Sequence, residues 1–172
     1  MTIPSPAPPT LGLECQDGTT VRYDRYREHF SPRAGVPVHW SWASIAQALA
    51  SAPQAERGSL TLSSTGSAPG CELLPGIAIN VQVVPSGAST RAHAHSWWHL
   101  FFVHSGRARA IIGLSDTRRL EAGDLLLVPA WNDHRFENDG DEDLVLLSMS
   151  NLPLQAALAN HLAREPVDSG AP

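Results

Sequence analysis

Two stretches of sequence decide the fold: RAHAHSWWHLFFVHSG at residues 91–106 and GDLLLVPAWNDHRFEN at residues 123–138. Each is a short apolar run bounded by glycine, proline, asparagine or aspartate, which is typical of strands in a sandwich or small barrel. Side chains alternate along a strand, so His93 and His95 face the same side of their sheet. His134 comes from a separate strand, and a closed barrel brings separate strands together. The pattern therefore predicts an all-β closed barrel.

The alternating pattern extends in both directions from these stretches. We predict strands at residues 59–63, 77–84, 91–95, 98–104, 107–112, 125–128, 134–137 and 144–149. Ahead of them Ser41 can cap a short helix, and a second short amphipathic helix follows Pro153. The expected order along the chain is a disordered Pro-rich tail (1–10), an N-terminal extension with one helix and edge strands (11–75), the barrel core (76–150), a C-terminal helix (151–165) and a disordered tail (166–172).

Composition and charge exclude several classes of protein. The 172 residues are enough for one domain with a sizeable core. There are 12 Lys and Arg against 17 Asp and Glu, a formal charge of -5, so the chain offers no basic face for nucleic acid. No apolar run approaches the roughly 20 residues that cross a bilayer, and no signal-peptide pattern opens the chain. The 2 cysteines have no metal-site spacing. We expect a cytoplasmic protein that binds neither nucleic acid nor membrane.

Histidines are concentrated around the two stretches, with five of the eight in the chain between residues 93 and 134. Several imidazoles on one predicted face are costly to bury without partners, so metal binding explains them better than packing does. His99 shares the parity of His93 and His95 if their strand is unbroken, and it is either a fourth ligand or a residue behind the ligands. The remaining histidines are expected to be solvated at the surface: His104, which has the opposite parity, and His29, His39 and His161.

A set of spaced positions resembles the two sequence motifs of the cupin superfamily: Gly87, His93, His95, position 99, Gly106, Gly123, Pro129, His134 and Asn138. Within that superfamily the chain most resembles the N-terminal half of gentisate 1,2-dioxygenase and of salicylate dioxygenase-like cupins. The resemblance rests on Ala55-Glu56-Arg57, on VQVVPSG at 81–87 and on Pro129-Ala130-Trp131. It implies a double-stranded β-helix with a short helix before and after it. It also implies that His93, His95 and His134 bind Fe(II) and that Gln82 faces the substrate.

The sequence departs from that family at three positions near the expected site. Position 99, usually Glu in cupins, is His, and four imidazoles on an octahedral ion would leave two open positions. Phe101 stands where the family has a carboxylate-binding arginine, and Phe136 where it has a further histidine. We therefore expect a more apolar cavity, walled by Trp97, Phe101, Trp131 and Phe136, and a substrate other than gentisate. Arg91 shares the parity of His93 and is either a replacement carboxylate clamp or a solvated rim residue.

Two classes of function fit these observations. The first is a single-domain, homodimeric, non-heme Fe(II) dioxygenase that binds O2 and a small aromatic or enolisable carboxylic acid. The second is a metal-containing binding or sensor cupin, or a non-oxidative cupin lyase or isomerase, that holds a small anion without redox chemistry. Imidazole ligands alone leave Zn, Ni, Cu and Mn as alternatives to iron.

Overall fold

The computed structural model describes residues 14–15, 18–19, 22–24, 37–52, 58–64 and 72–164. The predicted tails at 1–10 and 166–172, His29 and the tripeptide Ala55-Glu56-Arg57 lie outside these residues. The chain divides into two units, Met1–Val36 and Pro37–Pro172. Within the described part of the first unit, β1 (Glu14–Cys15) pairs antiparallel with β2 (Gly18–Thr19). Every histidine of the candidate site belongs to the second unit.

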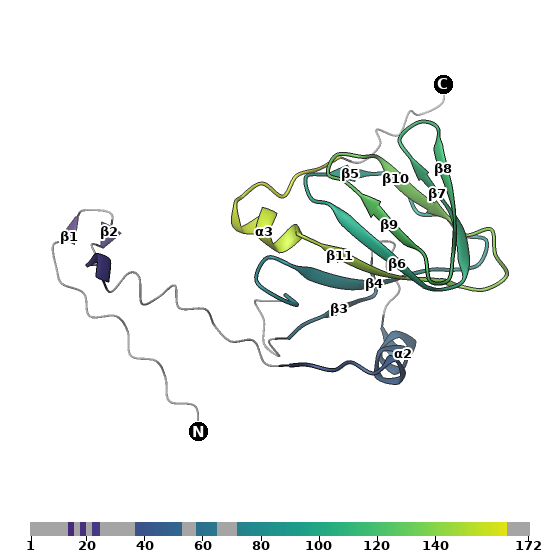
Figure 1. Ribbon diagram of the computed structural model, residues 1–172, viewed down its shortest axis with the longest axis horizontal. Helices are drawn as coiled ribbons and strands as arrows, with labels where there is room; N and C mark the ends of the chain where they lie inside the picture. The colour runs from purple at the N-terminus through teal and green to yellow at the C-terminus, as the bar shows by residue number, and fades with distance from the viewer. Residues whose placement is uncertain are drawn as a thin grey trace. The chain divides into compact units, whose positions relative to one another are not determined.

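The second unit is built from antiparallel sheets, as the alternating sequence pattern predicts. The largest sheet has the order β3-β4-β11-β6-β9: β3 is Leu60–Leu62, β4 Ala78–Val84, β11 Leu144–Ser150, β6 His99–Ser105 and β9 Leu125–Val128. A second sheet has the order β10-β7-β8: β10 is His134–Glu137, β7 Arg107–Ile112 and β8 Asp116–Glu121. A two-stranded sheet joins β5 (Ala94–His95) to β12 (Ala163–Arg164). Figure 1 shows β4, β11, β6 and β9 side by side, with α3 (Leu152–Ala157) at one end of them.

The core lies between the two larger sheets. Along β11 every second side chain is buried, beginning with Leu144 and Leu146, which is the alternation expected of a strand with one face inward. These leucines pack in one cluster with Phe101 of β6 and Phe136 of β10. The two phenylalanine rings meet edge to face, with their centroids 4.8 Å apart. Both also line the candidate site described below, so they separate the apolar core from it.

The helix before the barrel begins where the sequence predicts, whereas α3 begins at Leu152, just before Pro153. The helix α2 (Trp42–Ser51) starts after Ser41, whose side-chain oxygen accepts a hydrogen bond from the Ser44 backbone N–H at 3.2 Å. Trp42 at its first turn lies over His104 of β6, with ring centroids 3.5 Å apart. His104 is therefore half-buried, and the expectation that it is solvated is wrong because α2 covers this part of the sheet. None of the helices in the described residues is long and apolar enough to span a membrane.

Two strands of the second unit were not expected from the sequence, β8 and β12. β8 is charged and has only one buried residue, Leu120, so it lacks the alternation by which strands are recognised. It forms because Gly113 turns the chain back and β8 pairs along the whole of β7. β12 is two residues long and is defined only by its pairing with β5. In addition, α3 is shorter than predicted, because Ala159 has a positive φ of 53° and ends the helical path.

The turn from β6 to β7 depends on a glycine. Gly106 has a φ of +81°, and a Cβ at this position would lie 2.6 Å from the backbone oxygen of Asp143 and 2.9 Å from the Cα of Leu144. Both of those atoms belong to the backbone at the entrance to β11. The close approach therefore seats the β6–β7 hairpin against β11.

Candidate metal centre

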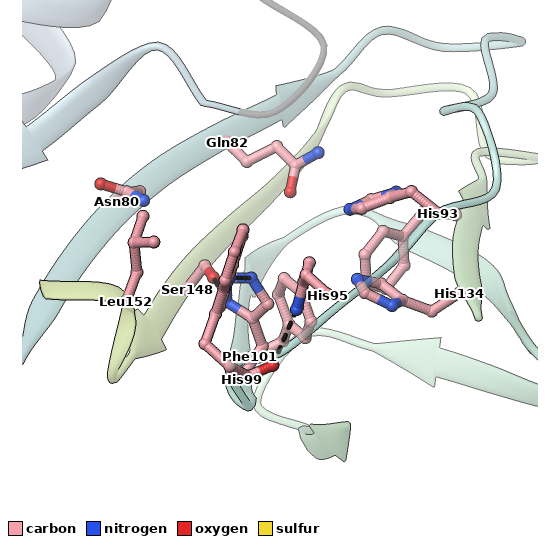
Figure 2. Close-up of a pocket in the computed structure, with 11 residues that line it drawn as sticks. Asn80, Gln82, His93, His95, His99, Phe101, His134, Ser148 and Leu152 are labelled. Carbon is pink, nitrogen blue, oxygen red and sulfur yellow. Dashed lines mark hydrogen bonds between the residues drawn. The ribbon is translucent and has the colours of Figure 1, made fainter. Parts of the chain in front are cut away.

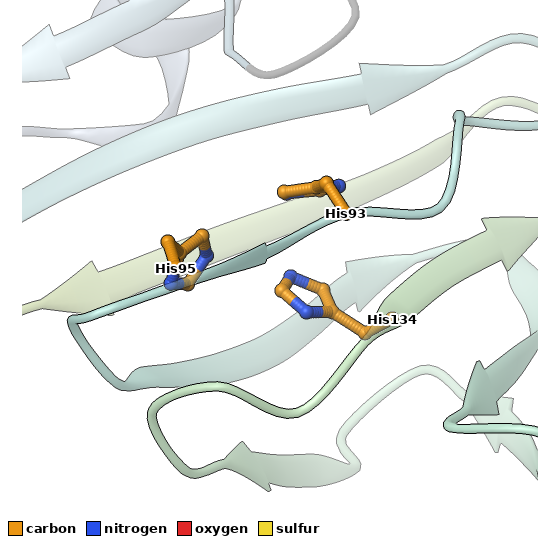
Figure 3. A group of neighbouring side chains, drawn as sticks. All are labelled: His93, His95 and His134. Carbon is orange, nitrogen blue, oxygen red and sulfur yellow. The ribbon is translucent and has the colours of Figure 1, made fainter. Parts of the chain in front are cut away.

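Three buried histidines converge at one point between β5 and β10 (Figure 3). His93 and His95 come from the segment that forms β5, and His134 is the first residue of β10. The backbones of His93 and His134 exchange two hydrogen bonds, of 3.1 and 2.9 Å, which fixes the two segments in register. One nitrogen from each of the three rings lies within 4.8 Å of the other two. This spacing suits a single metal ion shared by three imidazoles.

The Nδ1 atom of each ring lies against a backbone oxygen two residues away. The distances are 3.0 Å from His93 to Arg91, 2.7 Å from His95 to Trp97 and 2.9 Å from His134 to Asn132. A carbonyl oxygen can only accept, so Nδ1 carries the proton and the lone pair is on Nε2. Backbone bonds of this kind fix the tautomer and the orientation of metal-binding histidines. The donor set therefore fits a divalent transition metal held through three Nε2 atoms.

The centre contains no negative charge of its own. Burial lowers the pKa of His134 to about 4, so its ring is neutral at physiological pH. Within the described residues, the cavity beside the three rings is lined by neither Asp nor Glu. A divalent ion on three neutral imidazoles keeps its full charge, which favours an anionic ligand in the cavity.

His99 lies in the same cavity but makes different contacts. Its Nε2 accepts a hydrogen bond from the indole N–H of Trp97 at 3.1 Å, and its Nδ1 lies 2.6 Å from the Ser148 hydroxyl (Figure 2). Burial, and then the nearby imidazoles of the other three histidines, lower the pKa of His99 to about 2. His99 is thus a neutral ring with both nitrogens in hydrogen bonds. It does not belong to the group of three histidines whose ring nitrogens could share a metal ion.

The cavity has a volume of about 240 Å³, and most of the predicted substrate-binding residues line it. Gln82 extends its amide from β4 toward the histidines in Figure 2, and Trp97, Phe101 and Phe136 contribute aromatic surface. The lining residues that sequence reasoning missed are Asn80, Ser148 and Leu152. Asn80 shares the parity of Gln82 on β4, and that pattern could have identified it.

Two of the predicted substrate-binding residues do not line the cavity. Arg91 is exposed and is absent from the lining. Trp131 is 49% exposed and has a positive φ of 64°, and its backbone N–H donates to the His95 carbonyl at 2.7 Å. Trp131 therefore contacts the β5 segment through its backbone, and its half-exposed side chain is not part of the cavity lining.

The strand β12 pairs with the segment that carries His95. Ala163 of β12 pairs with His95, and the backbone N–H of Leu162 donates to the Ser96 hydroxyl at 3.0 Å. The guanidinium of Arg164 lies 2.6 Å from the carboxylate of Asp133, next to His134. Residues 162–164 thus connect the two segments that carry the three histidines.

The stability of the metal-free protein should fall on mild acidification. Unfolding returns the pKa of His134 from about 4 to its ordinary value of 6.5, so the unfolded state binds more protons between these two pH values. Stability should therefore be constant above about pH 6.5 and decrease toward pH 4, by on the order of 2–3 kcal/mol from this residue. Urea unfolding of chelator-treated protein at several pH values measures the free energy of unfolding. Between pH 6.5 and pH 4 this free energy should fall less steeply in His134→Gln than in the wild type. An equally steep fall in this variant would contradict the conclusion that His134 causes the pH dependence.

Comparison with known proteins agrees with this fold and site. Residues 80–150 match the cupin domain family. The chain is 30% identical over 133 residues to 1-hydroxy-2-naphthoate 1,2-dioxygenase of Nocardioides sp. (strain KP7), a match that covers 73% of this chain and 34% of that protein. It is 22% identical over 142 residues to 5-nitrosalicylic acid 1,2-dioxygenase of Bradyrhizobium sp., covering 77% of this chain and 68% of that protein.

Solved structures show the same fold. Salicylate 1,2-dioxygenase from Pseudaminobacter salicylatoxidans superimposes with a TM-score of 0.72 at 22% identity, over 83% of this chain and 42% of that chain. A mutant of that enzyme in complex with gentisate gives a TM-score of 0.74 at 20% identity, over 91% of this chain and 47% of that chain. The chain thus spans about a third of the naphthoate enzyme and less than half of the salicylate dioxygenase.

Residues 80–150 thus match the cupin domain family, and the fold is the cupin double-stranded β-helix with three buried histidines grouped in it. Within that class the resemblance predicted from the sequence is also confirmed, because the relatives are dioxygenases named for salicylate-type aromatic acids.

Proposed function

We propose that this chain is a cupin dioxygenase that holds one Fe(II) ion on His93, His95 and His134 and acts on a small aromatic carboxylic acid. The observation that carries the proposal is the set of three buried imidazoles, each oriented by a hydrogen bond to a backbone oxygen, beside a cavity that they help to line. The names of the relatives support the reaction class. When bound, the ion supplies Lewis-acid and one-electron chemistry and a template for the acid.

The protein side chains would bind and orient the substrate. Phe101 and Phe136 offer apolar faces for an aromatic ring and exclude water from its inner edge. Gln82 offers an amide that can both donate to and accept from the polar groups of the acid. His93, His95 and His134 would hold the ion, and with only three protein ligands it would have room for the acid and for O2.

Cavity size and charge narrow the substrate class. A volume of about 240 Å³ lies below the roughly 300–1,000 Å³ of sites for drug-sized ligands, so a single-ring acid fits best. Neither Lys nor Arg is among the described residues that line the cavity, so the carboxylate has no protein cation to bind there. We propose an acid with an adjacent hydroxyl, since the named substrates of the relatives share this pair of groups.

The test is O2 consumption by protein purified without affinity tag or chelator, analysed for metal and then loaded anaerobically with Fe(II). An O2 electrode would follow a panel that includes salicylate, 5-nitrosalicylate, gentisate, 1-hydroxy-2-naphthoate and benzoate. Uptake with a hydroxy acid but not with benzoate supports the proposal. A flat response across the panel, with iron stoichiometrically bound, would contradict it and favour a binding or non-oxidative cupin.

Replacing Gln82 by leucine should impair substrate use while leaving the metal in place. The change removes the amide but keeps the size of the side chain, so one hydrogen bond to the charged substrate is lost, and kcat/KM should fall roughly 10–100-fold. Steady-state O2 uptake and metal content measure this result. The matched control is Gln47→Leu, at an exposed position on α2, which should match the wild type. Unchanged kcat/KM in Gln82→Leu would exclude this residue from substrate binding.

A further inference from the structure

Trp97 contacts His95 in two ways. Its backbone oxygen accepts a hydrogen bond from Nδ1 of His95 at 2.7 Å, and its indole ring lies parallel to the imidazole, with centroids 4.1 Å apart and 4° between the planes. Trp97 itself lies between β5 and β6, outside both strands, so no strand pairing holds it. The position of the His95 ring therefore depends on what fixes the Trp97 side chain.

His99 and Ser148 supply that support. An indole N–H can only donate, so the 3.1 Å contact with Trp97 makes Nε2 of His99 an acceptor and places the ring proton on Nδ1. That proton is donated to the Ser148 hydroxyl at 2.6 Å. Ser148 belongs to β11, in the middle of the largest sheet, where it is buried and pairs in register with Phe101 of β6. The chain of contacts thus runs from a rigid strand to a metal-ligand candidate.

We infer that His99 is a positioning residue: together with Ser148 it holds the Trp97 indole against His95, and it does not bind the metal itself. The inference rests on the proposed function, in that His95 is taken as a ligand. The Nε2 lone pair of His99 accepts the hydrogen bond from Trp97, so while this bond is made the lone pair is not available to a metal ion. A glutamate, which is usual at this position in cupins, has only oxygens for the same task and would bring a negative charge into the centre.

Substitutions at position 99 separate positioning from ligation. His99→Leu removes both ring nitrogens, whereas His99→Gln keeps an oxygen that can accept from Trp97. With Co(II) as the probe, we expect the Kd to rise roughly 10–100-fold in His99→Leu, the usual effect of losing a group that orients a ligand. His99→Gln should recover most of that affinity, and Ser148→Ala should lie between the two. Melting temperatures of the metal-free variants show whether each one folds.

Pulsed EPR of the Cu(II) protein gives a second and independent measurement, the number of bound imidazoles. We expect three in the wild type and three in His99→Leu. A count of four in the wild type that falls to three in the variant would overturn the inference, as would His99→Gln binding Co(II) no better than His99→Leu.

Nitrogen NMR of the metal-free chain distinguishes failure of this inference from failure of the proposed function. The shifts should show a protonated Nδ1 and an accepting Nε2 on His99, and the indole N–H of Trp97 should shift in His99→Leu. If these signals are seen but the wild type binds neither Co(II) nor Cu(II), the metal site is wrong and the positioning contact stands. If the tautomer is reversed, the inference fails whatever the metal does.

Discussion

His95→Ala is expected to abolish stoichiometric metal binding. The substitution removes one of three ligands, and in this centre no carboxylate from the described residues can replace it. The loss of affinity should exceed the roughly 10–100-fold that follows from removing a residue that merely orients a ligand. Elemental analysis should find less than a full equivalent of metal, and added Fe(II) or Zn(II) should no longer raise the melting temperature.

The matched control for this loss is His104→Ala, which removes a half-buried histidine that contacts Trp42 rather than the three-histidine group. This variant loses the ring contact with Trp42, but it should retain a full equivalent of metal. If His95→Ala retained metal to the same extent as His104→Ala, the three-histidine centre would have to be abandoned. Equal losses in both variants would indicate a general folding defect, which circular dichroism would reveal.

Gly106→Ala should be the most destabilising glycine substitution in the described barrel. The left-handed φ of +81° costs a side-chain residue about 1–2 kcal/mol. The added Cβ would also press on the backbone at Asp143 and Leu144, and such overpacking costs about 1–3 kcal/mol more. The combined loss, about 2–5 kcal/mol, is large against the total stability of a typical domain. Urea unfolding of the metal-free protein measures it.

Gly113→Ala isolates the part of this cost that comes from the close approach. Gly113 also has a left-handed φ, +60°, but a Cβ there meets nothing within 4 Å. Its replacement should therefore cost only the backbone part, about 1–2 kcal/mol. If the free energy of unfolding fell equally in the two variants, the close approach between the β6–β7 turn and β11 would contribute nothing to the cost of Gly106→Ala.

Much of the fold was predictable because apolar residues alternate along most of the strands with a period of two residues. All eight expected strands are present, although β5 is shorter than expected, and the parity of His93 and His95 placed both rings on one face. β8 escaped because its stability comes from pairing with β7, and its sequence DTRRLE buries only Leu120. A local pattern of apolar residues does not indicate a strand that forms because it pairs with a neighbouring strand.

The candidate site was predictable only where it depends on neighbours in sequence. The role of His99 depends on Ser148, which is 49 residues away on another strand, and no spacing rule relates the two. Arg91 and Trp131 were assigned from parity and from family resemblance, whereas their orientation depends on how the chain turns before β5 and after β9. Parity arguments end where the strand ends, and both residues lie outside strands.

The short pairing of β12 with β5 bears on when the proposed metal ion could bind. Synthesis proceeds from the N-terminus, and domains begin to fold as the chain emerges. His93, His95 and His134 emerge well before Ala163 and Arg164, which join the segments that carry them. A nascent chain therefore exposes all three imidazoles before their frame is complete, at a stage when any abundant divalent ion can reach them. If the proposed ion binds there, the complete frame around it would be available only once residues 163 and 164 have joined the two segments.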